Sequence, residues 1–319
     1  MVKVSIIIPT RNHEHTIQQC LNSALSQKTN FDYEIIVGDD SSEDNTLNIL
    51  KEIASRHSNV IIVERQQNLG ATKNVYDLCL RMRGDYFAYL EGDDYWCDEN
   101  KLQKQYDFLQ ANPEYVGCFH DVKLIASDGT PLTKKLDWIS NKKIVTLKNF
   151  DGYRLPGHSS TWLRKNLYKS SPEDFELVYT LNRDIGDRSA ALCFLAKGAF
   201  YNVGGEMSCY RFVREKKANN VTSLYYLRSN NIIAFELDIL NKMETYCKDV
   251  LKVNKKFETR RHELSAKAFF RAVKHPTKEN KENLSKAFGS CTNKLLFVLK
   301  LPLFTMKKLW KKINILYKN

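Results

Sequence analysis

The sequence contains 319 residues with a mass of 37.1 kDa, and 43% of the residues are hydrophobic while 27% are charged. This ordinary globular composition excludes disordered, collagen-like and disulfide-scaffold proteins, and the length indicates one large domain or two fused ones. Lysine and arginine outnumber aspartate and glutamate by 49 to 37, so the formal charge of +12 favours polyanionic partners. The eight cysteines include no C-x-x-C pair, which argues against a zinc ribbon and favours free thiols in a reducing cytosol.

The first ninety residues alternate between short apolar runs and helical patterns. The apolar and β-branched runs predict strands at residues 4–8, 35–37, 60–63 and 86–90. Apolar residues at helical spacing predict helices at 17–25, 47–53 and 75–82. Strands separated by helices of this length predict right-handed crossovers and a parallel sheet covered on both faces.

The alternation loosens after residue 100. We expect a helix at 101–111, a strand at 116–125, a lysine-rich loop at 127–143, a strand at 159–163, a helix at 185–196 and a strand at 207–212. From about residue 225 no strand pattern remains, and apolar spacing predicts helices at 232–247 and 257–273. The second half therefore adds further strands and then a helical C-terminal region.

Polar and acidic clusters follow three of the predicted strands, at residues 9–12, 39–44 and 91–94. The carboxyl ends of parallel strands meet at one edge of a sheet, which is where such folds bind ligands. Five or more acids at one edge repel each other, and a divalent cation with substrate phosphates would relieve that repulsion. The sequence lacks G-x-G-x-x-G after the first strand and lacks a P-loop, which disfavours a dinucleotide oxidoreductase or a P-loop NTPase.

Four segments in order carry a resemblance to family 2 glycosyltransferases with the GT-A fold. They are residues 5–12 (SIIIPTRN), 35–46 (IIVGDDSSEDNT), 68–74 (NLGATKN) and 89–96 (YLEGDDYW). The resemblance implies an α/β fold with a mostly parallel central sheet flanked by helices, with a nucleotide-sugar-binding half at 1–98 and an acceptor-binding and catalytic half at 99–224. The helical spacing and the lysines near the end add an α-helical C-terminal extension with a basic tail at 225–319.

The same resemblance implies a donor site and a metal site. Asp93 and Asp94 correspond to the D-x-D region that holds Mn²⁺ or Mg²⁺ on the donor diphosphate, and Glu91 stands where aspartate is commoner. The donor-binding residues implied are Pro9, Thr10, Asn12, Asp40, Lys73, Asp93 and Arg211. Asp40 corresponds to the acid that bonds the nucleobase, and a carboxylate can accept the imide N–H of uracil or thymine.

The resemblance also implies a general base ahead of a helix in the second half. Asp187 matches this position, because an apolar helical run follows it, and Asp184 one turn earlier is the alternative. A first-turn acid that only stabilises the helix dipole is the structural interpretation of Asp187. Residues 157–160 (GHSS) lie in the region that forms the acceptor wall in relatives, which makes His158 an acceptor candidate. Asp184 and Trp96 are the other acceptor candidates. The histidine that relatives carry shortly after Tyr210 and Arg211 is missing.

The last segment, residues 294–319, has seven lysines and no acid, and its apolar residues include Phe297, Phe304 and Trp310. This pattern favours attachment to an anionic membrane surface, and a terminal helix packed on the protein is the alternative. No signal peptide precedes the first strand, and the apolar stretch at 295–303 is too short and interrupted to span a bilayer. We therefore expect a cytoplasmic protein at the cytoplasmic face of the membrane, and no nucleic-acid partner.

The resemblance to family 2 glycosyltransferases implies an inverting, metal-dependent glycosyltransferase. Its donor would be a nucleoside-diphosphate sugar, with UDP favoured, and its acceptor a glycan or lipid-linked oligosaccharide of a surface polysaccharide. A nucleotidyltransferase is one alternative, although residues 9–12 are not the glycine-rich basic loop that it normally carries. A non-catalytic nucleotide-sugar-binding protein is the other.

Overall fold

The computed structural model describes residues 1–213, 232–295 and 297–298. The chain divides into two compact units, and one of them is discontinuous in sequence. The first unit comprises Met1–Phe150 and Arg154–Leu224, and the second comprises Asp151–Tyr153 and Tyr225–Asn319.

The first unit opens with the alternating elements that the sequence predicts. They are β1 (Val4–Thr10), α1 (Ile17–Leu25), β2 (Tyr33–Asp39), α2 (Thr46–Ala54), β3 (Val60–Glu64), α3 (Ala71–Leu80) and β4 (Tyr86–Tyr89). The unit continues with β5 (Tyr95–Trp96), α4 (Lys101–Ala111), β6 (Tyr115–Ile125), β7 (Ile144–Val145), β8 (Leu163–Lys165), α5 (Leu177–Thr180), α6 (Asp187–Leu195) and β9 (Ala199–Arg211). Short 3-10 helices lie at Ser159–Thr161, Leu167–Lys169 and Pro172–Phe175.

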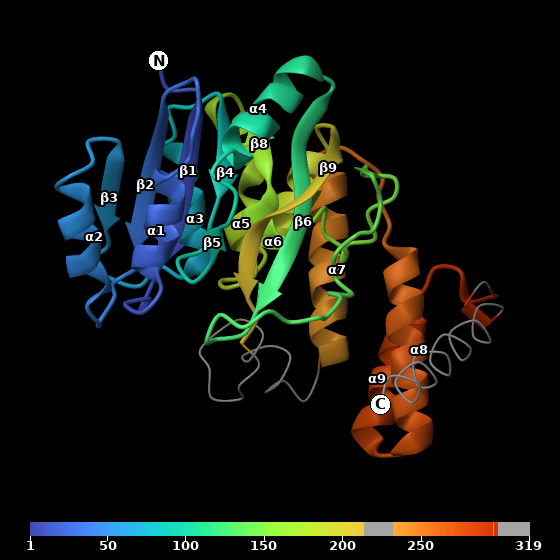
Figure 1. The fold of residues 1–319 in the computed structure, drawn as a ribbon. Helices are drawn as coiled ribbons and strands as arrows, with labels where there is room; N and C mark the ends of the chain where they lie inside the picture. Colours follow the sequence, from blue (N-terminus) through green and yellow to red (C-terminus); the bar gives the residue numbers. More distant parts are fainter. Residues whose placement is uncertain (214–231, 296, 299–319) are drawn as a thin grey trace. The chain divides into compact units, whose positions relative to one another are not determined.

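Nine strands in the described part of the chain form one mixed sheet (Figure 1) in the order β3-β2-β1-β4-β8-β6-β9-β5, with β7 paired to β9. β1 lies between β2 and β4 and is parallel to both, so consecutive chain segments reach opposite sides of it. The sheet becomes mixed at β8, which is antiparallel to β4 and β6. The fold is therefore α/β with a parallel first half, as predicted, and the order reverses at β1, where such sheets bind ligands.

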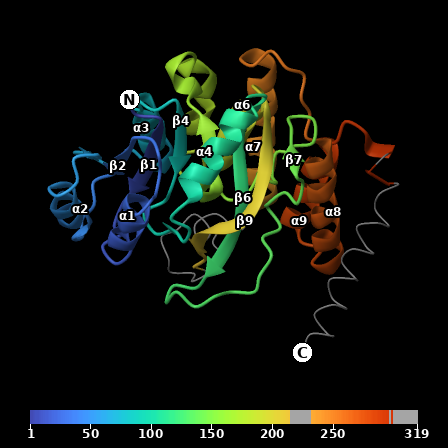
Figure 2. The same cartoon turned by 45° about the horizontal axis from the view of Figure 1, so that its top comes forward.

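Helices cover both faces of this sheet. α1 and α4 lie on one face, and α3, α5 and α6 lie on the other (Figures 1 and 2). Every residue of β1 is buried, and its Ile6 and Ile8 belong to one core cluster with Ile17 and Leu21 of α1. A strand buried on both faces requires the continuous β-branched run that this sequence supplies.

Gly38 allows α3 to approach β2 closely. A Cβ atom at this position would lie 2.6 Å from Asn74 Oδ1 and 2.8 Å from a Leu78 methyl carbon. The Asn74 amide also donates a hydrogen bond of 2.8 Å to the Gly38 carbonyl. This contact fixes the start of α3, and thereby the loop before it, against the carboxyl end of β2.

The described part of the second unit consists of helices and the short segment Asp151–Tyr153. The helices are α7 (Ile232–Asp249), α8 (Glu258–Lys274) and α9 (Lys278–Gly289). Arg260 of α8 is buried, pairs with Glu236 of α7 at 3.0 Å, and lies 3.4 Å from the centre of the Tyr153 ring. A buried charge pair of this kind fixes one arrangement of its neighbours, because either partner alone would be an uncompensated charge.

Two predicted elements differ from the structure, and the helix α9 was not predicted. The strand predicted at 159–163 is a 3-10 helix at Ser159–Thr161 followed by β8, because His158 caps this turn by accepting a hydrogen bond from the Ser160 N–H. The strand predicted at 207–212 begins at Ala199 and spans thirteen residues. α9 has no predicted counterpart, since its sequence is mostly polar.

The predicted basic tail lies mostly outside the described residues. Phe297 is described and buried, and its ring centre lies 5.5 Å from that of Phe288 and 6.1 Å from that of His262. This residue therefore packs within the helical unit, which corrects the expectation that it enters a membrane. Among the described residues, none of the helices is long and apolar enough to cross a bilayer.

The buried Lys101 should make the stability of the protein depend on pH. Its side chain is fully buried, donates 2.7 Å to Gln105 Oε1 and lies 4.2 Å from the centre of the Trp96 ring. Burial lowers the pKa of this ammonium from 10.5 to about 7. Because the folded pKa is below the unfolded value, the group costs stability below about pH 7, and the cost falls as the pH rises towards 10.5.

We predict that the free energy of unfolding rises by about 1–3 kcal/mol between pH 7 and pH 9 in the unmodified protein because Lys101 loses its proton. Lys101→Met should lack most of this rise, whereas Lys104→Met, which changes an exposed lysine of the same helix, should keep it. Urea denaturation at the two pH values measures the difference. An equal rise in the Lys101→Met protein would contradict the assignment.

Candidate functional site

The candidate site lies where β1, β2 and β4 end. The Asp40 N–H donates to the Thr10 carbonyl at 2.9 Å, and the Gly92 N–H donates to the Pro9 carbonyl at 3.3 Å. These bonds join the loops that follow three neighbouring strands. The three polar clusters that the sequence placed at strand ends therefore converge on one edge of the sheet, as expected.

Glu91, Asp93 and Asp94 form the acidic group at this edge. One carboxylate oxygen from each residue lies within 4.8 Å of the others. Asp94 is 1% exposed, and its Oδ1 accepts a hydrogen bond of 2.9 Å from the Arg211 N–H. Its Oδ2 is buried without a hydrogen-bond partner among the described residues.

Burial and mutual repulsion control the protonation of this group. Burial, followed by the charges of Asp93 and Asp187, raises the pKa of Glu91 to about 8. Burial, Asp93 and Glu91 raise the pKa of Asp94 well above its ordinary value. Three clustered carboxylates with one unpartnered buried oxygen fit a hard divalent cation, which would supply the missing positive charge.

Arg211 holds the acidic loop in place. Besides its N–H bond to Asp94, its Nε donates 3.0 Å to the Asp93 carbonyl. The two terminal nitrogens donate to the Ser127 carbonyl at 2.8 Å and to Gln19 Oε1 at 3.1 Å. The guanidinium that sequence reasoning directed at donor phosphate is therefore bonded to the protein itself.

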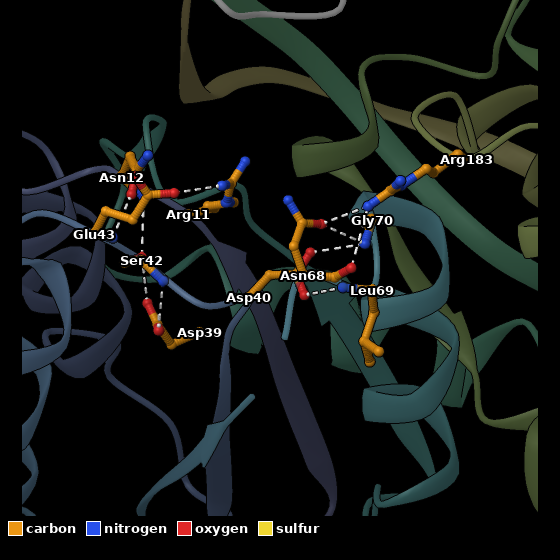
Figure 3. A network of polar contacts seen from close by, with 10 residues as sticks. All are labelled: Arg11, Asn12, Asp39, Asp40, Ser42, Glu43, Asn68, Leu69, Gly70 and Arg183. Atoms are coloured by element: carbon orange, nitrogen blue, oxygen red, sulfur yellow. Dashed lines mark hydrogen bonds and ion pairs between the residues drawn. The ribbon is translucent and has the colours of Figure 1, made fainter. Parts of the chain in front are cut away.

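Asp40 also holds a loop in place through hydrogen bonds. Figure 3 shows its two carboxylate oxygens directed at the loop before α3, where they accept hydrogen bonds from the Leu69 N–H at 2.7 Å and the Gly70 N–H at 2.9 Å. Gly70 has a φ of +90°, which favours glycine, and the Arg183 side chain bonds Asn68 in the same loop. Any bond from Asp40 to a nucleobase would use the remaining lone pairs of a carboxylate that already fixes this loop.

The remaining donor candidates differ in the contacts that their side chains already make within the protein. The Asn12 side chain accepts from the Glu43 N–H at 2.8 Å, which ties the loops after β1 and β2 together (Figure 3). Thr10 is buried with its hydroxyl 3.0 Å from His13 Nδ1. Lys73 is exposed, and its ammonium lies 3.9 Å from the centre of the Tyr179 ring.

Asp187 begins α6 and lies in the electrostatic environment of the acidic group. Its charge raises the pKa of Glu91 and of Tyr89, whose hydroxyl donates 2.8 Å to Glu91 Oε1. Burial raises the pKa of Asp187 to about 6, while the charge of Arg164 opposes that rise. A base with a pKa close to neutral is suited to accept a proton from a hydroxyl.

Asp184 differs from Asp187 in its surroundings. Both carboxylates are partly buried, and the Asp184 N–H bonds Asn182 Oδ1 at 2.8 Å. Among the interactions described, only Asp187 acts on Glu91 and Tyr89. Asp187 therefore acts on the charges of the acidic group, and Asp184 stays the alternative candidate.

The acceptor candidates His158 and Trp96 are both buried. His158 stacks on Tyr210 with ring centres 4.1 Å apart, and its Nδ1 lies 3.8 Å from Asp94 Oδ2. Burial lowers the pKa of His158 to about 3, so the ring is neutral and walls the acidic group. Trp96 is 4% exposed and donates 3.0 Å from its indole N–H to the Ser160 carbonyl, so we assign it to packing.

Sequence reasoning missed Arg164, the cation beside Asp187. Arg164 is buried, and its guanidinium lies 4.2 Å from the Phe87 ring centre and 5.0 Å from that of Phe194. The sequence gives one signal for it, a charged residue directly after the apolar pair Trp162 and Leu163. That signal is weak, because arginines commonly flank buried strands at the surface.

Comparison with known proteins decides the family. Residues 5–171, more than half of the chain, match the family described as Glycosyl transferase family 2. The chain belongs to this family. The match covers the parallel half of the sheet, the acidic group and β8, and it ends before Asp187.

Family 2 relatives share only part of their length with this chain. The poly(ribitol-phosphate) beta-glucosyltransferase of Bacillus spizizenii is 37% identical over 156 residues, which are 46% of this chain and 24% of that protein. The Escherichia coli UDP-Glc:alpha-D-GlcNAc-diphosphoundecaprenol beta-1,3-glucosyltransferase WfaP is 38% identical over 112 residues, 35% of this chain and 43% of that protein. The uncharacterised protein Rv1520 of Mycobacterium tuberculosis is 40% identical over 127 residues, 40% of this chain and 37% of that protein. The matches thus span less than half the length of each of these relatives.

A solved structure shares the fold. The crystal structure of Staphylococcus aureus TarS 1–349 in complex with UDP-GlcNAc superimposes with a TM-score of 0.63 and 17% identity, covering 90% of this chain and 80% of that chain. The GT-A-like fold that the sequence predicts is therefore confirmed.

We predict that Asp94→Asn loses Mn²⁺ affinity by at least about tenfold, because the change removes one anionic ligand and keeps the shape of the side chain. Folding should persist or become more stable, since a buried carboxylate beside two others is itself destabilising. Titration calorimetry with Mn²⁺ in the presence of UDP measures the affinity. Asp85→Asn, at the opposite end of β4, is the matched control and should bind normally.

Mn²⁺ binding should also strengthen as the pH rises from 6 to 8 and should release protons. Metal ligands must be deprotonated, and the raised pKa of Glu91, about 8, keeps that carboxyl largely protonated below this pH. Calorimetry in two buffers of different ionisation enthalpy measures the protons released. A pH-independent affinity, or unchanged binding by folded Asp94→Asn, would contradict the metal assignment.

Proposed function

We propose that this protein is an inverting, metal-dependent glycosyltransferase that moves a sugar from a UDP-linked donor to a hydroxyl group of a surface glycan or a lipid-linked oligosaccharide. The observation that carries the proposal is the buried, unpartnered carboxylate oxygen of Asp94 within an acidic group beside Asp187. Family membership supports a glycosyl transfer reaction. The names of the relatives support a surface polymer, and the TarS complex supports UDP as the donor nucleotide.

Asp94, Asp93 and Glu91 would hold the metal. When bound, Mn²⁺ or Mg²⁺ would offset the negative charge that grows on the leaving diphosphate. Arg211 keeps the Asp93–Asp94 backbone in position through its bonds to the Asp93 carbonyl and the Asp94 carboxylate. Charge stabilisation by fixed groups is effective because nothing has to reorganise during the reaction.

Asp187 would accept the proton of the acceptor hydroxyl as that oxygen attacks the anomeric carbon. A single attack from the face opposite the leaving group inverts the configuration at that carbon. Arg164 favours the ionised form of Asp187 and so opposes the effect of its burial. The balance leaves the pKa of this carboxyl at about 6, so most molecules carry a competent base at neutral pH.

The loops around the donor pocket are rigid before any donor binds. Asp40 fixes residues 68–70, while Asn12 and Asp39 brace the loop that follows β2. Among the donor candidates, Thr10 is the last residue of β1 and Lys73 lies in the first turn of α3. A rigid pocket lowers the ordering cost of donor binding.

The donor nucleotide can be identified by thermal shift with UDP-, GDP- and dTDP-sugars, each with and without Mn²⁺. A ligand that binds the native state alone raises the melting temperature by mass action. We expect a Mn²⁺-dependent rise with UDP-sugars. A rise with another nucleotide alone would reject UDP, and no rise with any of them would reject the nucleotide-sugar site.

We predict that Asp187→Asn keeps donor and Mn²⁺ affinity but loses transfer by about 10²–10⁴-fold, because an amide cannot accept the acceptor's proton. Asp184→Asn is the matched control, three residues earlier in the same segment. Radiolabelled transfer to a membrane-derived acceptor fraction measures activity, and calorimetry measures donor binding. Loss of transfer in Asp184→Asn alone would move the base to Asp184.

A further inference from the structure

The buried Thr72 holds the segment of chain that leads to Asp187. Thr72 is the second residue of α3, and its hydroxyl lies 2.9 Å from the carbonyl oxygens of both Asn182 and Arg183. Its N–H donates a further hydrogen bond of 3.1 Å to the Arg183 carbonyl. The first turn of a helix leaves its N–H groups without partners inside the helix, so a carbonyl from another segment satisfies one of them here. The start of α3 is therefore joined directly to residues 182–183.

The methyl group of Thr72 reaches the other end of the same segment. Gly186 is the last residue before α6, and a Cβ atom at this position would lie 3.2 Å from Thr72 Cγ2. Between the two ends, Asn182 Oδ1 accepts hydrogen bonds of 2.8 and 2.9 Å from the N–H groups of residues 184–185. One threonine side chain therefore touches both ends of a hydrogen-bonded turn, and Asp187 follows that turn immediately.

The segment is also attached to the loop at residues 68–70. Arg183 Nη2 donates to the Asn68 carbonyl at 3.1 Å and to Asn68 Oδ1 at 2.9 Å (Figure 3). The carboxylate of Asp40 accepts two hydrogen bonds from the same loop. The nucleobase candidate and the segment before α6 are therefore connected by a continuous series of contacts, whereas Arg211 supports the acidic group separately.

We propose that Thr72 is a positioning residue for glycosyl transfer, because its hydroxyl and methyl groups fix the position of Asp187 relative to a donor nucleotide held beside Asp40. This inference rests on the proposed function. A general base acts only within hydrogen-bond reach of the proton that it accepts, and a displacement of about 1 Å can cost about 100-fold in rate. Asp184, the alternative base, lies in the same segment and would be positioned by the same contacts.

Thr72→Val keeps the shape of the side chain and removes the hydroxyl. We expect kcat to fall by at least about tenfold, while the donor KM and the Mn²⁺ affinity stay within about twofold. Asp40 and Arg211 hold the donor loop and the acidic group without this hydroxyl, which is why binding should persist. Thr72→Ser keeps the hydroxyl and should transfer sugar at close to the unmodified rate. Thr29→Val removes a hydroxyl that bonds the Phe31 carbonyl ahead of β2, at the end of that strand away from the site, and should leave kcat unchanged.

Gly186→Ala tests the methyl contact independently. The φ of −109° at Gly186 suits alanine, so the fold should persist, but the new methyl group would press on Thr72 Cγ2 and displace Asp187. We expect kcat to fall by about threefold to tenfold. The double variant Thr72→Ser, Gly186→Ala lacks the opposing methyl group and should recover most of the lost rate, which general destabilisation would not allow. This pair of variants decides the question if Thr72→Val does not fold.

Two measurements separate this inference from the proposed function. Steady-state transfer gives kcat and the donor KM, and amide hydrogen exchange reports how firmly residues 182–187 are held. We expect faster exchange at these residues in Thr72→Val and unchanged exchange at residues 91–94. Unchanged kcat and exchange in folded Thr72→Val, or no recovery of rate in the double variant, would overturn the positioning role. Absence of transfer by the unmodified protein would instead reject the proposed function, and hydrogen exchange would still decide whether Thr72 holds the segment.

Discussion

Repulsion between clustered carboxylates, of which Asp94 is buried and Glu91 and Asp93 are half-buried, is the constraint around which the first unit is arranged. Glu91, Asp93 and Asp94 lie within 4.8 Å of each other, and Asp187 adds a fourth charge to the same field. Without compensation, such a group favours protonation or unfolding. The charge of Arg211 favours the ionised form of Asp94, and the charge of Arg164 favours the ionised form of Asp187. Neither arginine forms a direct ion pair with an acid of this group. The negative charges of these acids are therefore not fully compensated, which is more typical of binding sites than of structural ion pairs.

The polar residues nearest the proposed donor pocket mostly form hydrogen bonds that hold the backbone of the surrounding loops in place. Asp40 bonds the Leu69 and Gly70 amides, and Asn12 bonds an amide of the loop after β2. Such bonds satisfy loop amides that no sheet or helix satisfies, so the loops keep one shape at the pocket. A site built this way holds its groups in place before a ligand arrives, which spares the entropy of ordering them later.

The sequence predicted the parallel half of the fold well, because continuous apolar runs and helical spacing are local signals. It also placed the three polar clusters at one edge, since the ends of parallel strands coincide. It could not reveal which partners each polar side chain would find. The bonds of Asp40 and Arg211 connect residues 29 to 192 positions apart, and no periodic pattern encodes them. The turn at Ser159–Thr161 was misread as a strand because its serine and threonine residues suit extended chain until the His158 cap is considered.

The second unit is interwoven with the first at the level of the chain. The polypeptide enters it for Asp151–Tyr153, returns to build β8, α6 and β9, and enters it again after residue 224. Gly152, with a φ of +79°, leaves room for Leu240 and Phe257, and Tyr153 lies under Arg260. The C-terminal helices are thus topologically not an appendage that a recombination event could add or remove at one point. A chain cut after residue 224 would therefore part these helices from Asp151–Tyr153, which belong to the same compact unit.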